Sequence, residues 1–553
     1  MGSPTKEKDT METPLSKEKS PNGDGAHYPL LFSMRFWLAI ISFVGFINLY
    51  ALRINIAVGI VCMVNHTSVR METEMLALGN GHNETGLKED GRKCYASEGA
   101  NGTTTLKDGE FNWSKELQGI ILGSFFYGYI FTQFPGGYLS GRFGGKLVMG
   151  WCMFIAAVAT LLTPFCSRVS PYFLIALRIL VGLGEGVVFP CMNTIWAAWA
   201  PPLERSKLVG FTLAGAPMGN VVAFPLSGIL CSYGFDGGWP SIFYVFGMFG
   251  LLWFAAWMYL VSDTPAHHRH ISKEELEYIE HSVGSAEDTA HKREELGTPW
   301  RAIFTSVPVW SLIISHMCAN WGLFTLLTTL PTYMKEVLKF NIASNGALSA
   351  VPYIAFWACI NIAGNLADFM RARGVRTVVV RKLAMSIGTI LPGVFLIAAG
   401  HISCETPYIA VALMTMSIGF SGFQYSACFV NQLDIAPPFA GIIFGISNTA
   451  AAIPGFLGPY AVGKLTTHQT QAEWQVVFYI SGVIYGASAL IYALGTAGEV
   501  QPWCEPYLEG DVEEKKDPEA AIPLADIKQS VEDVKTITDL PTHKDMLLNK
   551  SYA

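Results

Sequence analysis

An arginine and a glutamate stand seven residues apart in an otherwise apolar run of the sequence. Arg178 and Glu185 are the charged residues of PYFLIALRILVGLGEGVVFP. If this run is a helix, seven residues make nearly two full turns, so both side chains lie on one face, about 10 Å apart along the axis. That separation is too long for a salt bridge, so we expect each charge to bond to another helix or to a ligand.

A third charge, Arg53, lies well inside the first apolar run, in LYALRINIAV. A guanidinium offers paired donors in a planar fork and therefore suits a carboxylate, so we interpret Arg53 as an anion-binding residue. The alternative is that its side chain reaches to the membrane surface. We interpret Glu185 as a proton carrier, because desolvation favours a neutral carboxyl group while a neighbour such as Arg178 favours the ionised one. The alternative is that Arg178 and Glu185 only hold helices together.

Uncharged residues from other apolar runs are candidates for the lining of the same cavity. Phe125 and Tyr129 are four residues apart and share one helix face. Asn320, Ser447 and Asn448 add groups that can form hydrogen bonds. We take these five residues as candidate substrate contacts, although aromatic stripes in membrane helices also serve packing alone.

The composition is that of a protein with many membrane-spanning helices. The chain has 553 residues, of which 51% are hydrophobic and 15% charged, whereas soluble domains carry about 25% charged residues. Its net charge is −7, and the acids lie mostly in loops and tails, which argues against nucleic-acid binding. Apolar runs near 20 residues form helices in lipid because the backbone must satisfy its own hydrogen bonds. We predict twelve spans, at 36–64, 117–138, 147–166, 171–198, 208–231, 239–261, 308–333, 343–366, 380–400, 407–432, 438–462 and 474–496.

A polar, charged stretch between the sixth and seventh spans divides the chain into two halves. It contains SKEELEYIEHSV, which we predict to be a short surface helix that begins after Ser272. The predicted organisation is a disordered cytosolic tail at 1–34, a six-helix bundle at 35–261, a cytosolic linker at 262–307, a second six-helix bundle at 308–498 and an acidic cytosolic tail at 499–553.

Two signals give the same orientation in the membrane. The loop at 65–116 carries the sequons of Asn65, Asn83 and Asn101, which we expect to be glycosylated on the lumenal side. A fourth sequon, at Asn112, lies too near the membrane to be counted with them. The short loops on the opposite side carry nine basic residues against four on the sequon side, as the positive-inside rule requires of the cytosolic face. Both termini are therefore predicted to be cytosolic.

The eleven cysteines show no CxxC pair and no cluster with histidine. Most fall in predicted spans, where packing is the simplest interpretation. Cys94 and Cys404 lie in predicted lumenal loops, where a disulfide between them is one option. We expect neither a metal nor an organic cofactor, only a proton or sodium as coupling ion.

Two loops at corresponding places in the halves suggest an internal repeat. GGYLSGRFGGK follows the second span and GNLADFMRARG follows the eighth. They resemble the loop signature of the major facilitator superfamily, which implies paired transport bundles. Gly141 stands where that signature usually has an aspartate. The resemblance implies a cytosolic gate formed by Arg142, Lys146, Asp368 and Arg371.

Longer strings resemble the organic anion transporter family that includes sialin, the vesicular glutamate transporters and the sodium–phosphate cotransporters. These strings include LGSFFYGYIFTQFPGGY, WAPPLERSKL and LPTYMKEVLKFN, and the sialin-like members look most similar. The resemblance implies that Arg53 binds substrate and that Glu185 and Arg178 serve proton coupling. It also implies a lysosomal or vesicular membrane. A second glutamate that sialin has in the fourth span is replaced by Val181.

The sequence therefore predicts an all-α major facilitator fold that carries small organic anions by alternating access, driven by protons. Sialic acid, acidic sugars and acidic amino acids are the expected substrates. A sodium-dependent phosphate or anion cotransporter at the plasma membrane is the alternative, and a non-transporting receptor is a third hypothesis. No nucleophile–base set or phosphate loop indicates an enzyme. The expected partners are the substrate and the bilayer, with sorting adaptors that could bind YPLL, Tyr28–Leu31.

Overall fold

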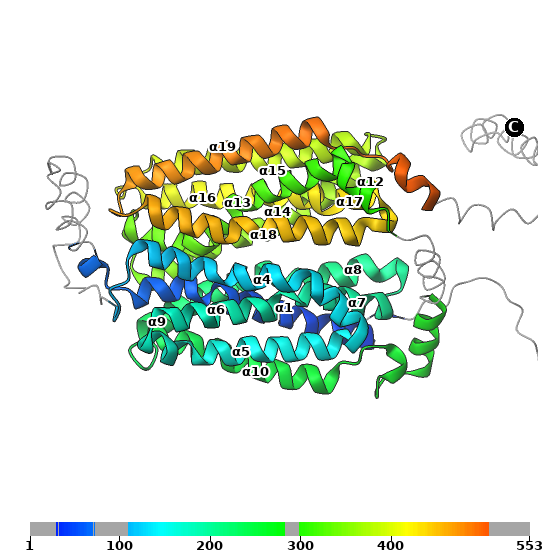
Figure 1. The fold of residues 1–553 in the computed structure, drawn as a ribbon, viewed down its shortest axis with the longest axis horizontal. Coiled ribbons are helices and arrows are strands. Elements are labelled where there is room, and N and C mark those ends of the chain that lie inside the picture. Colours follow the sequence, from blue (N-terminus) through cyan, green and yellow to red (C-terminus); the bar gives the residue numbers. More distant parts are fainter. Residues whose placement is uncertain (1–28, 31–32, 70, 72–108, 283–297, 508–553) are drawn as a thin grey trace, which may run out of the picture.

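The computed structural model describes residues 29–30, 33–69, 71, 109–282 and 298–507. Within these residues the chain is helical and forms two bundles that lie side by side, as Figure 1 shows. This confirms the predicted fold class. Asn83, Asn101, Cys94, Tyr28 and most of both predicted tails lie outside the described residues.

Among the described residues, eight named helices form the N-terminal bundle, and seven helices with three 3₁₀ turns form the C-terminal one. The N-terminal helices are α1 (Met34–Met63), α4 (Lys115–Phe143), α5 (Gly145–Val169), α6 (Pro171–Gly186), α7 (Val188–Trp199), α8 (Pro202–Leu213), α9 (Gly215–Tyr233) and α10 (Trp239–Leu260). The turn η2 (Pro265–His267) and α12 (Trp300–Thr305) follow α10 in the chain. The C-terminal helices are α13 (Val307–Glu336), α14 (Ile342–Ala372), α15 (Thr377–Gly400), α16 (Pro407–Ser421), α17 (Cys428–Ile435), α18 (Ala440–Leu465) and α19 (Gln471–Gly495), with the turns η3 (Gly422–Ser426), η4 (Pro437–Phe439) and η5 (Pro502–Tyr507).

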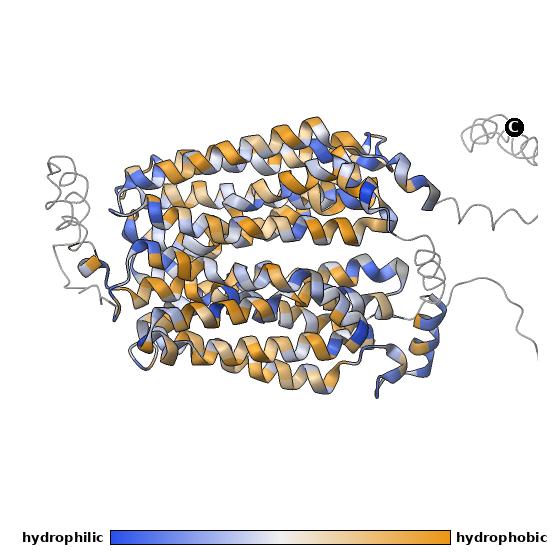
Figure 2. Ribbon diagram, in the orientation of Figure 1, coloured by the Kyte–Doolittle hydropathy of each residue, from blue (hydrophilic) through white to orange (hydrophobic). Residues whose placement is uncertain are grey.

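Each predicted span coincides with a helix or with consecutive helices of the structure. Among the described residues, ten segments are long and apolar enough to cross a membrane. The other two predicted spans are α4 and the α16–α17 pair, which pack among them. Figure 2 shows that hydrophobic residues run along the helices while hydrophilic ones gather at both ends of the molecule.

Three of the spans are interrupted, which the sequence analysis did not foresee. The fourth span breaks at Val187 and the fifth at Ala214. Pro190 and Pro217 explain these two breaks, because each lacks the N–H that would bond to the carbonyl four residues earlier. The tenth span passes through the 3₁₀ turn Gly422–Ser426.

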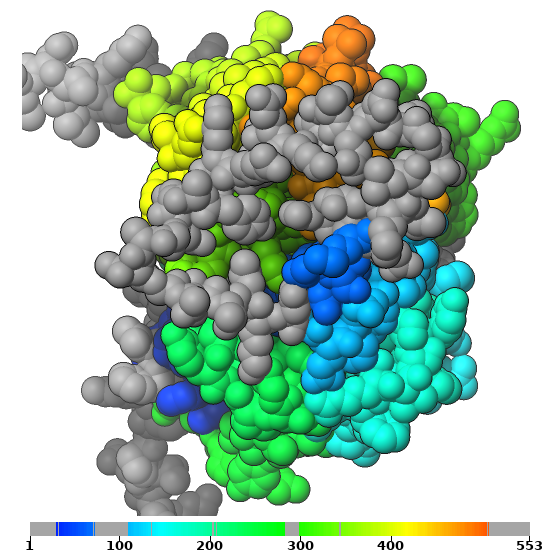
Figure 3. Space-filling model, turned by 90° about the vertical axis from the view of Figure 1, so that its left-hand side faces the viewer, coloured from blue at the N-terminus to red at the C-terminus, as the bar shows by residue number. Residues whose placement is uncertain are grey.

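The two bundles meet at the end where α1 finishes and α4 begins, which we call the lumenal end after its predicted orientation. Lys115 of α4 forms an ion pair with Glu336 of α13. Glu116 of α4 pairs with Lys464 of α18 at 2.7 Å. Figure 3 views this end, where the blue and cyan segments of the N-terminal bundle adjoin green and orange segments of the other. Charged residues from both bundles therefore close the lumenal end.

A histidine lies inside this closed end, beyond the last turn of α1. The Nζ of Lys335 donates to the carbonyl of Val61 at 3.0 Å, and Nε2 of His66 lies 3.2 Å from the same oxygen. Burial, together with the ammonium groups of Lys335 and Lys115, holds the pKa of His66 well below its ordinary value. His66 is therefore neutral while this end is closed.

Glycines of α4 and α18 differ in packing between the two ends of the molecule. Near the lumenal end Gly123 packs on Phe456, so closely that a Cβ would touch the facing backbone. Toward the opposite, cytosolic end, Gly141 of α4 and both Gly441 and Gly445 of α18 are exposed. The close approach of the two helices is therefore shown near the lumenal end.

The first part of the linker packs against the N-terminal bundle. Residues 273–282 are helical, and the Ser272 hydroxyl accepts from the Glu275 N–H, which confirms the predicted helix start. The Glu275 carboxylate accepts from the backbone N–H of Arg35 at the first turn of α1. The fully buried Arg35 side chain also pairs with Glu204 of α8 at 2.5 Å. The predicted surface helix is thus confirmed, with Glu275 and Ile279 on its buried side.

A disulfide joins Cys62 near the end of α1 to Cys231 near the end of α9. The packing interpretation of the span cysteines was therefore wrong for this pair. Cys404 is also disulfide-bonded, and its predicted partner, Cys94, lies outside the described residues.

Candidate functional site

Arg53 and Glu185 form a buried ion pair between α1 and the end of α6. Nε of Arg53 lies 3.2 Å from Oε2 of Glu185, and the two residues are 5% and 0% exposed. Glu185 occupies the last turn of α6, directly before the break at Val187. The carboxylate is thus presented to the guanidinium by the last turn of α6, directly before the break. Arg53 does not reach to the membrane surface, so that alternative is wrong.

Three aromatic rings surround the Arg53 guanidinium. Its Cζ lies 4.6 Å from the ring centre of Tyr50, and 4.7 Å from those of Phe125 and Tyr129. Contacts of this kind stabilise a cation by roughly 0.5 to 2 kcal/mol each when desolvated. The structure thus brings two predicted substrate contacts, Phe125 and Tyr129, against the predicted anion-binding residue. Tyr50 was not singled out from the sequence, although it lies one turn from Arg53 on the same helix.

Arg178 bonds to α1 and not to Glu185, as its seven-residue spacing predicts. It donates to the carbonyl of Arg53 at 2.6 Å, to that of Leu52 at 3.1 Å and to Oδ1 of Asn55 at 3.4 Å. These bonds fix the backbone that carries Arg53 and place a second positive charge beside the pair. Arg178 therefore holds the backbone of α1 in position, which agrees with the interpretation that it holds helices together.

The cluster keeps unused hydrogen-bonding capacity. Nη2 of Arg53, Nε of Arg178 and Oε1 of Glu185 are buried and have no hydrogen-bond partner in the described part of the chain. Buried polar atoms without partners are costly, so a native structure that retains them usually has a functional reason. Donors from Arg53 suit a carboxylate, and the free oxygen of Glu185 suits a proton.

The C-terminal bundle contributes neutral polar groups. Nδ1 of His316 on α13 and Oγ of Ser447 on α18 share a hydrogen bond of 2.7 Å. Asn320 donates to the His316 carbonyl in its own helix at 3.2 Å, while Asn448 donates across the bundles to Gln133 at 3.0 Å. Ser447 and Asn448 therefore face different helices, and their role in binding stays a prediction. His316 was missed, although a lone histidine in an apolar run was visible.

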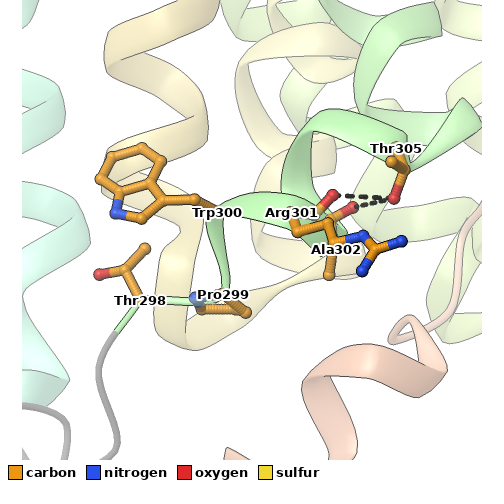
Figure 4. A pocket seen from close by; sticks show the side chains of 6 residues that line it. All are labelled: Thr298, Pro299, Trp300, Arg301, Ala302 and Thr305. Carbon is orange, nitrogen blue, oxygen red and sulfur yellow. Dashed lines mark hydrogen bonds between the residues drawn. The ribbon is translucent and has the colours of Figure 1, made fainter.

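One shallow hollow lies apart from this cluster, at α12. Figure 4 shows the six residues that line it, which all come from one short segment: Thr298, Pro299, Trp300, Arg301, Ala302 and Thr305. It shares no residue with the Arg53 cluster, so it is not the candidate site.

Comparisons with known proteins agree with this arrangement. Residues 96–459 match the family model described as Major Facilitator Superfamily. Sialin of Homo sapiens is 43% identical over 506 residues, which cover 90% of this chain and 95% of sialin. The chain belongs to the sialin-like organic anion transporters of the major facilitator superfamily. It is therefore a membrane transporter and not an enzyme.

More distant relatives share the fold or part of the sequence. Vesicular glutamate transporter 3 of Danio rerio is 38% identical to this sialin-like chain, covering 85% of it and 74% of the relative. A crystal structure of a D-xylose–proton symporter has a TM-score of 0.57 at 15% identity and covers 84% of this chain and 99% of its own. An inward-facing bacterial homologue of the lysosomal transporter Spinster also has a TM-score of 0.57, at 14% identity, and covers 84% and 97%. The last two show the fold alone.

The predicted gating residues of this sialin-like transporter do not meet across the bundles within the described residues. Arg142 donates to the Tyr138 hydroxyl in its own helix at 3.1 Å. Asp368 and Arg371 are exposed, and neither forms an ion pair among the residues that the structure describes. Their gating role stays a prediction.

An acid from the start of the linker occupies the loop that lacks the family aspartate. Oδ1 of Asp263 accepts from the backbone N–H of Lys146 at 2.7 Å, in the first turn of α5. Its carboxylate lies against Gly144, whose φ of +85° favours glycine. Asp263 thus caps α5 directly after the loop that contains Gly141. The family resemblance leads one to expect an acid at the Gly141 position of that loop.

Of the sequons, the structure describes those of Asn65 and Asn112. The Asn65 side chain accepts from the Ser68 N–H at 2.9 Å, and its backbone N–H donates to the Phe111 carbonyl at 2.8 Å. Glycosylation at Asn65, Asn83 and Asn101 stays a prediction.

Proposed function

We propose that this transporter carries small organic anions out of an acidic lumen together with a proton. The observation that carries the proposal is the buried Arg53–Glu185 ion pair, with an unused donor on one partner and an unused acceptor on the other. Arg53 binds the carboxylate of the substrate, Glu185 carries the proton and Arg178 holds α1 in place.

Coupling follows from competition for one guanidinium. The substrate carboxylate and the Glu185 carboxylate need the same donors of Arg53, and two unit charges 4 Å apart repel by roughly 4 kcal/mol at an effective dielectric of about 20. When Glu185 takes up a proton, it loses its charge and releases Arg53. Substrate and proton therefore load together, and Glu185 re-forms the pair after both have left.

The polar groups of the C-terminal bundle favour a substrate with one anionic end. His316, Asn320 and Ser447 offer neutral hydrogen-bonding groups, and the charged residues of α13 and α18 lie at the lumenal ends of these helices. A second carboxylate or an ammonium group in mid-membrane would lack a charged partner there. We therefore place acidic sugars ahead of acidic amino acids as substrates.

Alternating access assigns the described conformation to release. Its lumenal end is closed by the Lys115–Glu336 and Glu116–Lys464 pairs, whereas Gly141, Gly441 and Gly445 toward the other end are exposed. A lysosome or secretory vesicle, with both termini in the cytosol, provides the acidic lumen that the proton cycle requires. This localisation is part of the proposal.

Uptake into proteoliposomes tests the proposal. Glucuronate, N-acetylneuraminate, glutamate and inorganic phosphate are offered with an inward proton gradient, and separately with a sodium gradient at constant pH. We expect the proton gradient to accelerate uptake by the wild type. Glu185→Gln should lose this acceleration, but it should still exchange labelled for unlabelled substrate when the concentrations on both sides of the membrane are equal. Glu110→Gln, which alters an exposed lumenal ion pair, is the matched control and should behave as the wild type.

Three results would contradict the proposal. Proton-driven uptake by Glu185→Gln at the wild-type rate would refute the coupling role. Acceleration by sodium alone would favour the sodium-dependent alternative. Binding without flux of any probe would favour a receptor.

A further inference from the structure

The tenth span is broken in the C-terminal bundle, as the fourth is in the N-terminal bundle. Helix α16 ends at Ser421, the turn Gly422–Ser426 follows, and Ala427 leaves the helical region at φ −102° and ψ −91° before α17 begins. Each break lies in the fourth span of its bundle. Transporter sites commonly form where membrane helices are discontinuous, and the N-terminal break already carries Glu185.

Tyr425 lies inside this break, and its ring packs against two phenylalanines of its own bundle. Its ring stacks on Phe429, with centroids 4.1 Å apart and planes 5° apart, and meets the ring of Phe356 at 5.5 Å and 83°. The side chain lies within electrostatic range of Arg53, Tyr50 and Tyr129, which all belong to the N-terminal bundle. Its hydroxyl makes no hydrogen bond with any residue that the structure describes. Tyr425 thus offers, from the opposite bundle, a hydroxyl that is unpartnered among the described residues and lies within electrostatic range of the Arg53 cluster.

Two residues near Tyr425 also have polar side-chain atoms without hydrogen-bond partners among the described residues. The preceding residue, Gln424, is 1% exposed, and neither atom of its amide has a hydrogen-bond partner in the described chain. Nε2 of His316 is likewise buried without a partner there, and the His316 ring meets Phe429 edge-on at 4.8 Å. Three side chains of one bundle therefore have hydrogen-bonding capacity that no described residue uses. Such a set points to a ligand with several neutral polar groups.

We propose that Tyr425 is a specificity-determining residue of the transport site. The proposal rests on the proposed function, because it gives the anion held by Arg53 a second contact. The Tyr425 hydroxyl donates a hydrogen bond to the bound carboxylate, opposite the guanidinium. Its ring, fixed by Phe429 and Phe356, limits the size of the group attached to that carboxylate. Because Arg53 and Tyr425 belong to different bundles, an anion that reaches both also draws the bundles together.

Kinetics of two Tyr425 variants test this proposal. Tyr425→Phe keeps the ring and its stacking and removes only the hydroxyl, so the bundle should fold as the wild type does. Hydrogen bonds to charged groups are among the stronger ones, so we expect KM to rise about tenfold for whichever of glucuronate, N-acetylneuraminate, glutamate and phosphate the wild type carries best. The maximal rate should change less than twofold, because ring packing is preserved. Tyr172→Phe, on a side chain that is 76% exposed, is the control and should leave KM unchanged.

The second variant tests the size limit. Tyr425→Leu removes the ring, so it should admit p-nitrophenyl glucuronide, whose uptake we expect to rise at least fivefold relative to that of glucuronate. An unchanged KM in Tyr425→Phe, with normal transport by the wild type, would overturn the contact with the carboxylate and leave the proposed function standing. If the uptake of p-nitrophenyl glucuronide relative to that of glucuronate is unchanged in Tyr425→Leu, the size limit is overturned. If the wild type carries none of the four probes, the proposed function fails and the role of Tyr425 fails with it.

Discussion

Replacing Arg53 alone should destabilise the transporter more than removing the charges of both Arg53 and Glu185. In Arg53→Met the Glu185 carboxyl group stays fully buried but loses its ion-pair partner. Glu185→Gln keeps a neutral acceptor for Arg53, whose guanidinium still lies against three rings. The double variant leaves neither charge of the pair, so it should recover much of what the first substitution loses.

The magnitude follows from the burial of the pair. Breaking a buried ion pair by removing one partner costs about 3 to 5 kcal/mol, because the other charge is left uncompensated. The exposed pair of Arg168 and Glu110, whose side chains are 39% and 44% exposed, should couple by at most about 1 kcal/mol. We therefore expect a coupling energy of about 3 kcal/mol for Arg53 and Glu185, against less than about 1 kcal/mol for the control pair.

The assay is a double-mutant cycle on the purified protein in detergent, with unfolding by SDS followed by circular dichroism. A pH series adds an independent check. The orphaned carboxyl group of Arg53→Met is stable in its buried site only with a proton, so folding of this variant takes up a proton above pH of about 4.3. Its unfolding free energy should then fall as pH rises, by up to about 1.4 kcal/mol per pH unit. A coupling energy no larger than that of Arg168 and Glu110, or no added pH dependence in Arg53→Met, would refute the reasoning.

Three further predictions concern the ends of the bundles. The pKa of His66 is lowered in the closed lumenal end, so the closed state is fully stable above a pH of about 6.5 and loses stability as lumenal pH falls below it. Labelling of Thr332→Cys by an impermeant maleimide should therefore rise at pH 5. The additional substitution His66→Gln should abolish this rise. Replacing Cys62 and Cys231 by serine should lower the unfolding free energy by about 2 to 4 kcal/mol, and equal stability of the variant and the wild type under oxidising conditions would contradict this. Asp263→Ala should cost about 1 kcal/mol through loss of the α5 cap, whereas substitution of the exposed Glu499 should change thermal stability little.

Sequence patterns predicted the helical spans and the charges inside them. The seven-residue spacing of Arg178 and Glu185 correctly excluded a bond between them, because helix geometry alone decides it. The same geometry cannot say which helix each charge will meet. The contacts of Glu185 with Arg53, and of Arg178 with the backbone of α1, depend on how α6 packs against α1. Such contacts between distant segments are set by tertiary packing and were beyond sequence reasoning.

The residues that sequence analysis missed have uncharged side chains in apolar surroundings. His316 and Tyr425 lie in runs where aromatic residues usually serve packing, and only the unused polar atoms around them set them apart. The break at Gly422–Ser426 contains no proline, unlike the breaks that follow from Pro190 and Pro217. The Cys62–Cys231 disulfide joins residues 169 positions apart, so no local pattern marks it.

The unequal chemistry of the two bundles bears on how transport is coupled to their movement. Arg53, Arg178 and Glu185 all belong to the N-terminal bundle. Loading a proton on Glu185 and a substrate anion on Arg53 therefore leaves the charge of the C-terminal bundle unchanged. An anion that bound only Arg53 would interact equally with the open and closed arrangements and could not shift their equilibrium. A group of the C-terminal bundle must therefore contact the substrate more strongly when the cavity closes. Tyr425 belongs to the opposite bundle and lies within electrostatic range of Arg53, so it meets this requirement, and its loss should weaken closure as well as affinity.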